Sequence, residues 1–380
     1  MTQTADVIVL GLGGMGSSAA AHLARRGARV IGLEAFAPLH ANGSSHGRSR
    51  IIRQVYYESP DYVPFLRRAY ELWRELEADS GAELLTITGG LNIGLPQSDF
   101  VAGAEASAER FGLPAELLSA AEVHERFPGF SLPPTYVAVY EPNAGFLRPE
   151  ECIRAALDRA AAAGADLRFE EPALAWEPRG DGVRVETARD RYESERLVIA
   201  AGPWSAAVLA DLGLPLTVRR IVNAHFSPRD PERFTPERCP VYLLTVPEGE
   251  FYGFPALPGE GLKVGGPHEG GELCTPQTIE RTIHEREVDL LRAVLDRYLP
   301  GASGEVLWTL TCMYTNTPDR HFVIDRHPRH PQVVFGCGFS GHGFKFASAI
   351  GEVLADLALG GATPHDIGFL SATRFRDSGV

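Results

Sequence analysis

The first thirty-five residues alternate between two apolar patterns. The segment from Asp6 to Leu10, which is apolar at every position after Asp6, predicts a buried β-strand, and residues 14–26 carry small and apolar side chains at helical spacing. Gly27 predicts the end of this helix, and residues 28–33 predict a second buried strand. The chain therefore opens with the strand–helix–strand unit that is typical of parallel α/β sheets.

Similar patterns return at the middle and at the end of the chain. Residues 218–315 are instead rich in strands and Pro/Gly turns, with one helix predicted at about residues 276–298. The remaining predicted elements are a helix at residues 148–164, strands at 166–169, 197–202, 322–325 and 333–335, and a helix at 343–359. We expect an α/β fold with two domains. The first is discontinuous, built from residues 1–80, 144–217 and 320–380, and a β-sheet-rich domain takes residues 81–143 and 218–319.

A glycine motif joins the first strand to the first helix. Gly11, Gly13 and Gly16 form GxGxxG, and Glu34 ends the second strand 18 residues after Gly16. Glycines at this spacing let the backbone approach a pyrophosphate at the positive helix N-terminus, and an acid at this position can hold ribose hydroxyls. The motif in this context predicts a Rossmann-like dinucleotide site, without separating FAD from NAD.

Charge and cysteine content narrow the function classes. The 380 residues include 36 Lys+Arg against 49 Asp+Glu, for a net charge of −13, which repels nucleic acid and anionic lipid. We therefore expect neither a nucleic-acid nor a membrane partner. The five cysteines are widely spaced without a CxxC pair, so we expect no disulfide framework and no metal site. Because the N-terminus has neither a basic leader nor a spanning segment, a cytoplasmic protein is predicted.

Lysine is nearly absent from the chain. The two lysines are Lys263 and Lys345, and all other cationic side chains of the Lys/Arg type are arginine. A chain that uses arginine almost everywhere and lysine twice suggests that a compact, titratable ammonium is required at those positions. Chance is the alternative interpretation.

Three segments concentrate chemically active residues. Residues 40–53 combine three arginines and two histidines with Gly, Ser and Asn, and we expect Ile51 and Ile52 to anchor the segment inward. Arg50 and Arg53 would then lie one helical turn apart on one face. A solvated basic loop is the alternative. Residues 312–322 begin with Cys312, for which an inert buried thiol is the alternative, and four glycines at residues 336–343 predict an anion-accepting turn before a helix.

Taken together, these segments resemble the monomeric sarcosine oxidase and N-methyltryptophan oxidase family. The similarity runs nearly end to end through HANGSSHGRSRIIR, YVPFLRRAYELW, EPNAGFLRPEECIRA, FYGFPALPGEGLKVG, CMYTNTPDRHFVID and GFSGHGFKFASAIGEVL. The resemblance implies a two-domain fold like that of glutathione reductase and p-hydroxybenzoate hydroxylase. It also implies FAD attached covalently through Cys312, with Arg50 and His46 as the nearby cationic groups that would lower the thiol pKa.

The resemblance also implies roles for individual residues. Arg53 and Lys345 would hold the substrate carboxylate, and Lys263 would promote the reaction with O₂. The implied catalytic residues are Lys263, Arg50, His46, Tyr252, Tyr314 and His268. The implied cofactor-binding residues are Gly11, Gly13, Gly16, Glu34, Ser45, Arg50, Cys312, Gly341, Gly343 and Lys345.

The implied activity is oxidation of a sarcosine-like N-methyl amino acid by a monomer, giving the primary amino acid, formaldehyde and hydrogen peroxide. One alternative is a flavin oxidase of a cyclic imino acid such as pipecolate or proline, or of a bulkier substrate such as N-methyltryptophan. An NAD-dependent dehydrogenase would leave Cys312 and the glycine-rich turn unused. A non-catalytic nucleotide-binding protein would need neither lysine.

The sequence departs from the sarcosine oxidase pattern in three places. Arg48 stands where an aspartate is expected, and Ser49 where a threonine is expected. The segment from Lys263 to His268 is one residue longer than the family spacing. The shape of the pocket near His268 is therefore expected to differ, and its reach to the substrate is left open.

Overall fold

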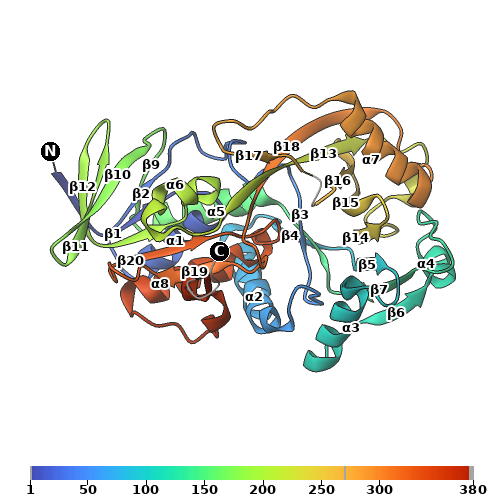
Figure 1. Cartoon of the computed structure of the whole chain (residues 1–380), viewed down its shortest axis with the longest axis horizontal. Helices are drawn as coiled ribbons and strands as arrows, with labels where there is room; N and C mark the ends of the chain where they lie inside the picture. The colour runs from blue at the N-terminus through green and yellow to red at the C-terminus, as the bar shows by residue number, and fades with distance from the viewer. Residues whose placement is uncertain (1, 269–270, 376–380) are drawn as a thin grey trace.

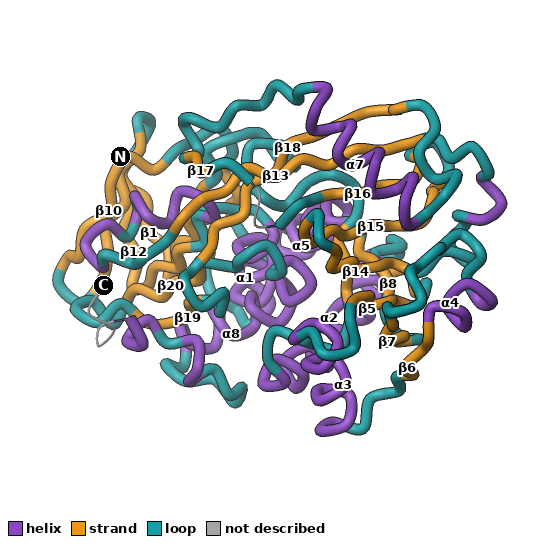
Figure 2. The backbone as a smooth tube through the Cα atoms, turned by 45° about the vertical axis from the view of Figure 1, so that its right-hand side comes forward, coloured by secondary structure: helices purple, strands orange, loops and turns teal. Residues whose placement is uncertain are grey.

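The computed structural model describes residues 2–268 and 271–375. Two large sheets lie side by side along the long axis of the molecule (Figure 1). The sheet containing β1 (Thr2–Leu10) and β12 (Arg191–Ile199) occupies one half, and the chain begins at the outer end of this half (Figure 1). The sheet containing β13 (Thr217–Phe226) to β18 (Val306–Asn316) occupies the other half, and the long strands β13 and β18 extend from it toward the first half (Figures 1 and 2).

The first sheet has eight strands and contains the predicted strand–helix–strand unit. Its order is β10-β11-β12-β1-β2-β9, and β20 pairs in parallel with the end of β12 and antiparallel with β19. β1 is parallel to both of its neighbours, β12 and β2, as the buried apolar runs indicate. The strands are β1 (Thr2–Leu10), β2 (Val30–Leu33), β9 (Asp166–Arg168), β10 (Ala173–Arg179), β11 (Gly182–Thr187), β12 (Arg191–Ile199), β19 (Val323–Arg326) and β20 (Val333–Cys337).

The second sheet has nine strands, and most neighbours are antiparallel. Its order is β17-β13-β16-β15-β14-β5-β7-β6, and β18 pairs with β13 along its whole length. Its strands are β5 (Gly90–Gly94), β6 (Glu116–Ser119), β7 (Val137–Glu141), β13 (Thr217–Phe226), β14 (Val241–Val246), β15 (Gly249–Leu257), β16 (Gly261–Gly265), β17 (Leu273–Cys274) and β18 (Val306–Asn316).

A small third sheet and the helices complete the fold. The small sheet has the order β3-β8-β4, from β3 (Arg50–Ile52), β8 (Gly145–Leu147) and β4 (Leu85–Ile87). Helix α1 packs against α5 and α8, which covers the apolar face of the first sheet. The helices are α1 (Gly14–Arg25), α2 (Val63–Ser80), α3 (Asp99–Phe111), α4 (Ala120–Arg126), α5 (Pro149–Ala162), α6 (Ser205–Val208), α7 (Glu285–Tyr298) and α8 (Ala347–Leu359). The mixed α/β fold is confirmed, while the domain boundaries given above stay a prediction.

The helix predicted at residues 276–298 begins later than expected. Helix α7 starts at Glu285, where His284 and Glu287 form a capping box. Before it, the buried Arg220 guanidinium donates hydrogen bonds to the carbonyls of Glu280 and Thr282. Residues 279–284 form no helix in the structure, and these hydrogen bonds hold the segment against Arg220. The helical prediction for residues 276–284 was therefore wrong.

The geometry predicted for Arg50 and Arg53 was also wrong. Residues 50–52 form strand β3, which pairs with β8, so Arg50 and Arg53 are not one helical turn apart. Side chains three positions apart along an extended chain point to opposite sides. Because Arg50 and Arg53 point to opposite sides, they lie in two different surroundings, which are described below.

The helix predicted at residues 343–359 begins later than expected. Residues 344–346 form a 3₁₀ turn, and the α-helix itself begins at Ala347.

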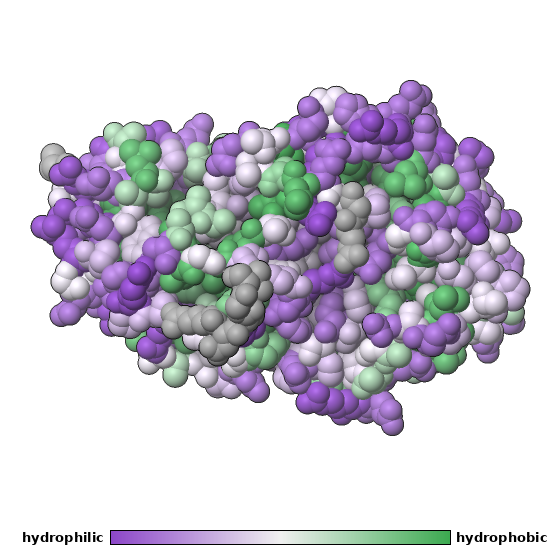
Figure 3. Space-filling view, in the orientation of Figure 1, coloured by the Kyte–Doolittle hydropathy of each residue, from purple (hydrophilic) through white to green (hydrophobic). Residues whose placement is uncertain are grey.

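Hydrophobic side chains appear as small separate areas among hydrophilic ones on the face in Figure 3. Among residues 2–268 and 271–375, no helix has the length and apolar character needed to cross a membrane.

Candidate cofactor and substrate site

A cavity of 760 Å³ lies at the carboxyl ends of the first sheet's parallel strands. This edge, where loops follow the strands, is where α/β sheets bind ligands. The cavity is lined from the glycine motif, the turn after β2, residues 43–45 with Arg50, the turn after β12 and the glycine-rich segment before α8. Predicted cofactor residues on its wall are Gly11, Gly13, Glu34, Ser45, Arg50, Gly341 and Gly343.

The three motif glycines are required for three different reasons. A Cβ on Gly16 would lie 1.7 Å from the carbonyl oxygen of Gly11, so only glycine lets the helix start so close to the strand. Gly11 has a φ of +86°, and its Cβ would lie 2.5 Å from the carbonyl oxygen of Ala200. Gly13 lines the cavity, and its Cβ would meet no protein atom within 4 Å. The free space there fits the close approach of a pyrophosphate.

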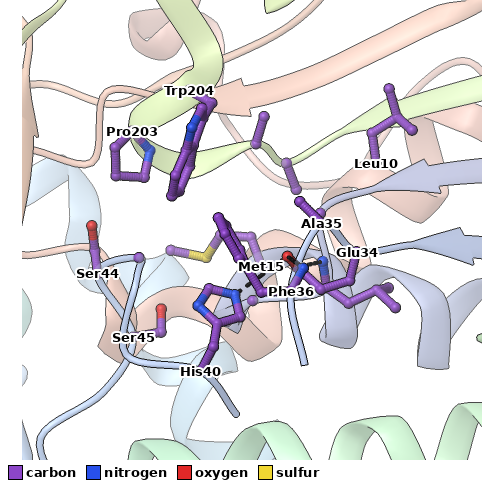
Figure 4. Close-up of a pocket in the computed structure, with 18 of the residues that line it drawn as sticks. Leu10, Met15, Glu34, Ala35, Phe36, His40, Ser44, Ser45, Pro203 and Trp204 are labelled. Carbon is purple, nitrogen blue, oxygen red and sulfur yellow. Dashed lines mark hydrogen bonds and ion pairs between the residues drawn. The ribbon is translucent and has the colours of Figure 1, made fainter. Parts of the chain in front are cut away.

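Glu34 fixes the wall of the cavity next to the glycine motif. Its carboxylate accepts hydrogen bonds from the backbone N–H of Leu12 at 2.8 Å and of Phe36 at 3.2 Å, and His40 lies 3.3 Å away. Figure 4 shows Trp204 facing Phe36 and His40 across this end of the cavity, and the Phe36 and Trp204 rings are 5.4 Å apart. Aromatic side chains around an acid suit the adenosine end of a dinucleotide.

Cys312 lies just outside the opposite end of the cavity, on β18. Its Sγ is 3.7 Å from Nη2 of Arg50 and 3.6 Å from the carbonyl oxygen of Ser44, and both of those residues line the cavity. His46 is buried nearby, where its Nε2 lies 3.0 Å from the carbonyl oxygen of Thr311. Burial, with the charge of Arg50, lowers the pKa of His46 to about 4. His46 is therefore neutral at physiological pH, and Arg50 is the cation beside the thiol.

Lys263 extends from β16 toward the 47–49 segment and is 1% exposed. Its Nζ donates hydrogen bonds to the carbonyl oxygens of Gly47 at 2.8 Å and Ser49 at 3.0 Å, and to the Ser49 hydroxyl at 3.3 Å. Burial, with the charge of Arg50, lowers the pKa of Lys263 well below its ordinary value. The three oxygen acceptors favour the charged form and oppose that shift.

Tyr252, Tyr314 and His268 meet beside Cys312. Tyr252 packs against Cys312 and Tyr314, and its hydroxyl donates to Oδ1 of Asn223 at 2.6 Å. The His268 ring lies 4.9 Å from that of Tyr314, so the longer spacing after Lys263 does not carry His268 away from this cluster. Burial raises the pKa of Tyr252 to about 12 and lowers that of His268 to about 4. Both side chains are therefore neutral near pH 7.

Arg53 and Lys345 form a separate pair of buried cations. Tyr56 lies under both, with Cζ of Arg53 4.3 Å and Nζ of Lys345 5.3 Å from its ring centre. Nζ of Lys345 donates to the carbonyl oxygen of His342 at 2.6 Å. Burial, with the charge of Arg53, lowers the pKa of Lys345 to about 7. Lys345 was also predicted to bind the cofactor, but it is not among the residues that line the large cavity.

Glu58, the ion-pair partner of Arg53, was not predicted from the sequence. Nη2 of Arg53 lies 2.7 Å from both carboxylate oxygens of Glu58, and the side chains are 5% and 9% exposed. Glu150 was missed too, although its carboxylate accepts from the backbone N–H groups of Gly47 and Arg48. Glu58 belongs to no periodic or glycine-rich pattern, whereas Glu150 lies in the family-like segment EPNAGFLRPEECIRA and in the first turn of the helix predicted at residues 148–164.

The fold, the glycine turn and the cavity define a class of protein. Residues 6–357 match the family described as FAD dependent oxidoreductase, and the chain belongs to this family. The prediction of an FAD enzyme is thereby confirmed, and the NAD-dependent and non-catalytic alternatives are set aside.

Comparison with individual proteins shows which members of this family the chain resembles. It is 50% identical to the monomeric sarcosine oxidase of Streptomyces avermitilis over 379 residues, covering 98% of each chain. It is 42% identical to the monomeric sarcosine oxidase of Bacillus sp. (strain B-0618), covering 97% of this chain and 96% of that one. It is 35% identical to the N-methyl-L-tryptophan oxidase of Yersinia pestis (strain Pestoides F), covering 98% of this chain and 99% of that one. The predicted family resemblance is confirmed.

Solved structures agree with this fold. NikD, an unusual amino acid oxidase essential for nikkomycin biosynthesis, has a TM-score of 0.85 at 28% identity, with 97% of each chain covered. L-proline dehydrogenase from P. horikoshii has a TM-score of 0.83 at 23% identity, with 99% of each chain covered. The second likeness concerns the fold alone.

Proposed function

We propose that this chain oxidises a secondary N-methyl amino acid of the sarcosine type. The N-methyl amino acid, O₂ and water would give the primary amino acid, formaldehyde and hydrogen peroxide. FAD, when bound, would supply the two-electron redox chemistry that couples oxidation of the amine to reduction of O₂. The relatives named as sarcosine and N-methyltryptophan oxidases support this substrate class.

The observation that carries the proposal is the buried pair Arg53 and Lys345. Glu58 neutralises one of these two positive charges, and the second is a costly buried charge unless another anion binds the pair. A substrate carboxylate matches them, because arginine offers a planar fork and lysine a point charge. Glu58 occupies one edge of the Arg53 fork, so a carboxylate ligand must share the guanidinium with Glu58 or displace it.

Cys312 is proposed to hold FAD covalently. Attachment requires the thiolate, and Arg50 is a permanent cation 3.7 Å from the sulfur, which favours the anion. Met313 and Tyr314, the next residues of β18, line the cavity, so the thiol lies at its edge. Tyr252, Tyr314 and His268 would form the wall near the reacting carbon, where their neutral side chains keep the surroundings of the substrate amine free of extra charge.

Lys263 is proposed to act on O₂. The first electron transfer to O₂ creates an anion, and a buried ammonium stabilises an anion far more than water-screened charge does. The carbonyl oxygens of Gly47 and Ser49 hold Nζ beside Arg50 and Cys312, near the same end of the cavity. We further propose a monomer that works in the cytoplasm, supported by relatives named as monomeric and by the cysteine content.

A peroxide-release screen tests the substrate class. Purified holoenzyme is mixed with sarcosine, N-methyl-L-tryptophan, other N-methyl amino acids, proline and pipecolate, and hydrogen peroxide and formaldehyde are both measured. Sarcosine or another N-methyl amino acid should give the highest kcat/KM with equal amounts of the two products. Peroxide without formaldehyde, from proline or pipecolate alone, would replace the proposal with a cyclic imino acid oxidase.

The carboxylate anchor is tested with a double variant that removes both members of the Arg53–Glu58 pair, so that neither is left as an unpaired buried charge. Glu58→Gln is the control, and Arg53→Met is added to it. Loss of a charge-assisted contact costs about 1.5–3 kcal/mol, which corresponds to roughly 10- to 100-fold in kcat/KM. Equal kcat/KM in the control and the double variant would remove Arg53 from substrate binding.

A further inference from the structure

A second, much smaller cavity lies against Arg53. Its volume is 10 Å³, which is about the smallest space that holds one water molecule, and it forms where β5, β7 and β14 meet the segment after β3. Its charged or amide-bearing lining residues are Arg53, Asn92 and Glu141, with 4%, 2% and 1% of their surface exposed. Within the described ranges, neither Nε of Arg53 nor Oδ1 of Asn92 has a hydrogen-bond partner.

The sheet register places Asn92 and Glu141 on the face toward Arg53. Gly90 pairs with Glu141 and Asn92 with Val139 between β5 and β7. Side chains alternate along each strand, so Asn92 points away from Leu91 and Ile93, which pack in the core beyond the sheet. Asn92 and Glu141 are therefore two polar side chains on one strand pair, directed at the same buried arginine.

Glu141 already holds the backbone next to Arg53. Its two carboxylate oxygens accept hydrogen bonds from the N–H groups of Gln54 at 2.8 Å and Val55 at 3.0 Å. Nη1 of Arg53 in turn donates to the carbonyl oxygen of Val55 at 2.7 Å. Any movement of the Glu141 carboxylate is thus transmitted through this turn to the guanidinium group.

We propose that Glu141 and Asn92, with one water molecule bound between them and Arg53, form a network that positions Arg53 for the substrate carboxylate. The water would accept from Nε of Arg53 and donate to Oδ1 of Asn92 and to the Glu141 carboxylate. Three hydrogen bonds are typical of a buried water, and an ionised carboxylate has acceptor sites beyond its two backbone bonds. The inference rests on the proposed role of Arg53 as carboxylate anchor. Glu141 and Asn92 act through Arg53 and are positioning residues.

The network has a pH signature that a merely structural role lacks. Burial raises the pKa of Glu141 to about 7, and protonation removes an acceptor from the turn, so ligand binding weakens as pH falls through about 7. Lys345, with its pKa lowered to about 7, loses its charge as pH rises, so binding weakens on that side too. Carboxylate affinity should therefore peak near neutral pH. The other charged or titratable groups that bear on Glu141 are Arg53, Tyr70 and, through Arg53, Glu58.

The test uses the holoenzyme and acetate as a carboxylate probe that cannot be oxidised. Acetate Kd is measured across about pH 5.5–9 from the flavin absorbance change in wild type, Glu141→Gln and Asn92→Leu. Sarcosine KM is measured against kcat at the same pH values. Loss of one or two positioning hydrogen bonds should weaken acetate about 5- to 20-fold with a smaller change in kcat. Glu141→Gln should also lose the acidic limb and keep the basic limb, which belongs to Lys345.

Glu77→Gln is the matched control. Glu77 also accepts from two successive backbone N–H groups, those of Leu84 and Leu85, at 2.8 and 2.9 Å, but it holds the start of β4 instead of the Arg53 turn. It should leave acetate affinity and the pH profile unchanged. A crystal structure of the wild type should show water density in contact with Nε of Arg53.

Each outcome decides between the inference and the proposed function. Unchanged acetate Kd and pH profile in both Glu141→Gln and Asn92→Leu overturn the network, provided that Arg53→Met in the Glu58→Gln background still weakens acetate. If that Arg53 variant binds acetate normally, the anchor itself fails. If Glu141→Gln does not fold, Asn92→Leu and the crystal structure decide, and a dry cavity with unchanged acetate binding in Asn92→Leu refutes the proposal.

Discussion

Replacing Lys263 should separate the two halves of the catalytic cycle. An ammonium about 4 Å from a new negative charge, at an effective dielectric of about 20, contributes about 4 kcal/mol, which corresponds to roughly a thousandfold in rate. Lys263→Met should therefore slow the reaction with O₂ by about two to four orders of magnitude. Anaerobic reduction by substrate should change far less, because no oxygen anion forms in that half-reaction. Stopped-flow absorbance of the flavin measures each half separately.

The same substitution has a structural consequence that must be measured alongside. Methionine removes the hydrogen bonds that Lys263 donates to the carbonyl oxygens of Gly47 and Ser49, at about 1 kcal/mol each, although the Ser49 N–H and Nη1 of Arg50 still donate to these two oxygens. Lys263→Met should therefore also lower the free energy of unfolding. Lys263→Arg tests whether a compact ammonium is needed, since a wide guanidinium cannot meet three acceptors grouped around one nitrogen.

The pH dependence of the wild type gives an independent check on Lys263. Because its pKa lies well below 10.5, the reaction with O₂ should slow as pH rises through that lowered value, and this limb should vanish in Lys263→Met. Equal losses in both half-reactions, or full recovery with Lys263→Arg, would refute the assignment of Lys263 to the oxygen site.

Three further substitutions test other parts of the site. Cys312→Ala should release all yellow colour on acid precipitation, whereas wild-type protein should keep it in the pellet; free colour from the wild type would contradict the covalent link. Gly16→Ala places a Cβ 1.7 Å from a carbonyl oxygen, so the purified variant should contain little or no FAD by absorbance, and a fully loaded variant would refute the close-approach argument. Burial alone would raise the pKa of Glu58, but the charge of Arg53 lowers it, so the pair stabilises the fold above the unfolded pKa. Urea titrations of Glu58→Gln should show a deficit of about 3–5 kcal/mol at pH 7 that shrinks as pH falls through the lowered pKa, and a pH-independent deficit would contradict this.

Interactions between residues close in the chain were predictable from the sequence. The turn from Gly11 to Gly16 needs glycine because a Cβ on Gly16 would collide with the carbonyl oxygen of Gly11, and the spacing of the two glycines in the sequence reveals this constraint. The apolar runs of the first sheet were equally readable, because a strand buried on both faces needs apolar residues throughout. The position of Cys312 beside Arg50 was expected only through the family resemblance, since 262 residues separate them.

Other features were decided by the tertiary structure alone. The helix predicted before Glu285 does not form, and the segment instead binds the buried Arg220 through the carbonyls of Glu280 and Thr282. Glu58 pairs with Arg53, and Glu141 reaches the Arg53 turn across 87 residues of sequence. No local pattern selects these partners. A buried charge must find a counter-charge or hydrogen-bond partners wherever the fold brings them, and sequence spacing does not record that choice.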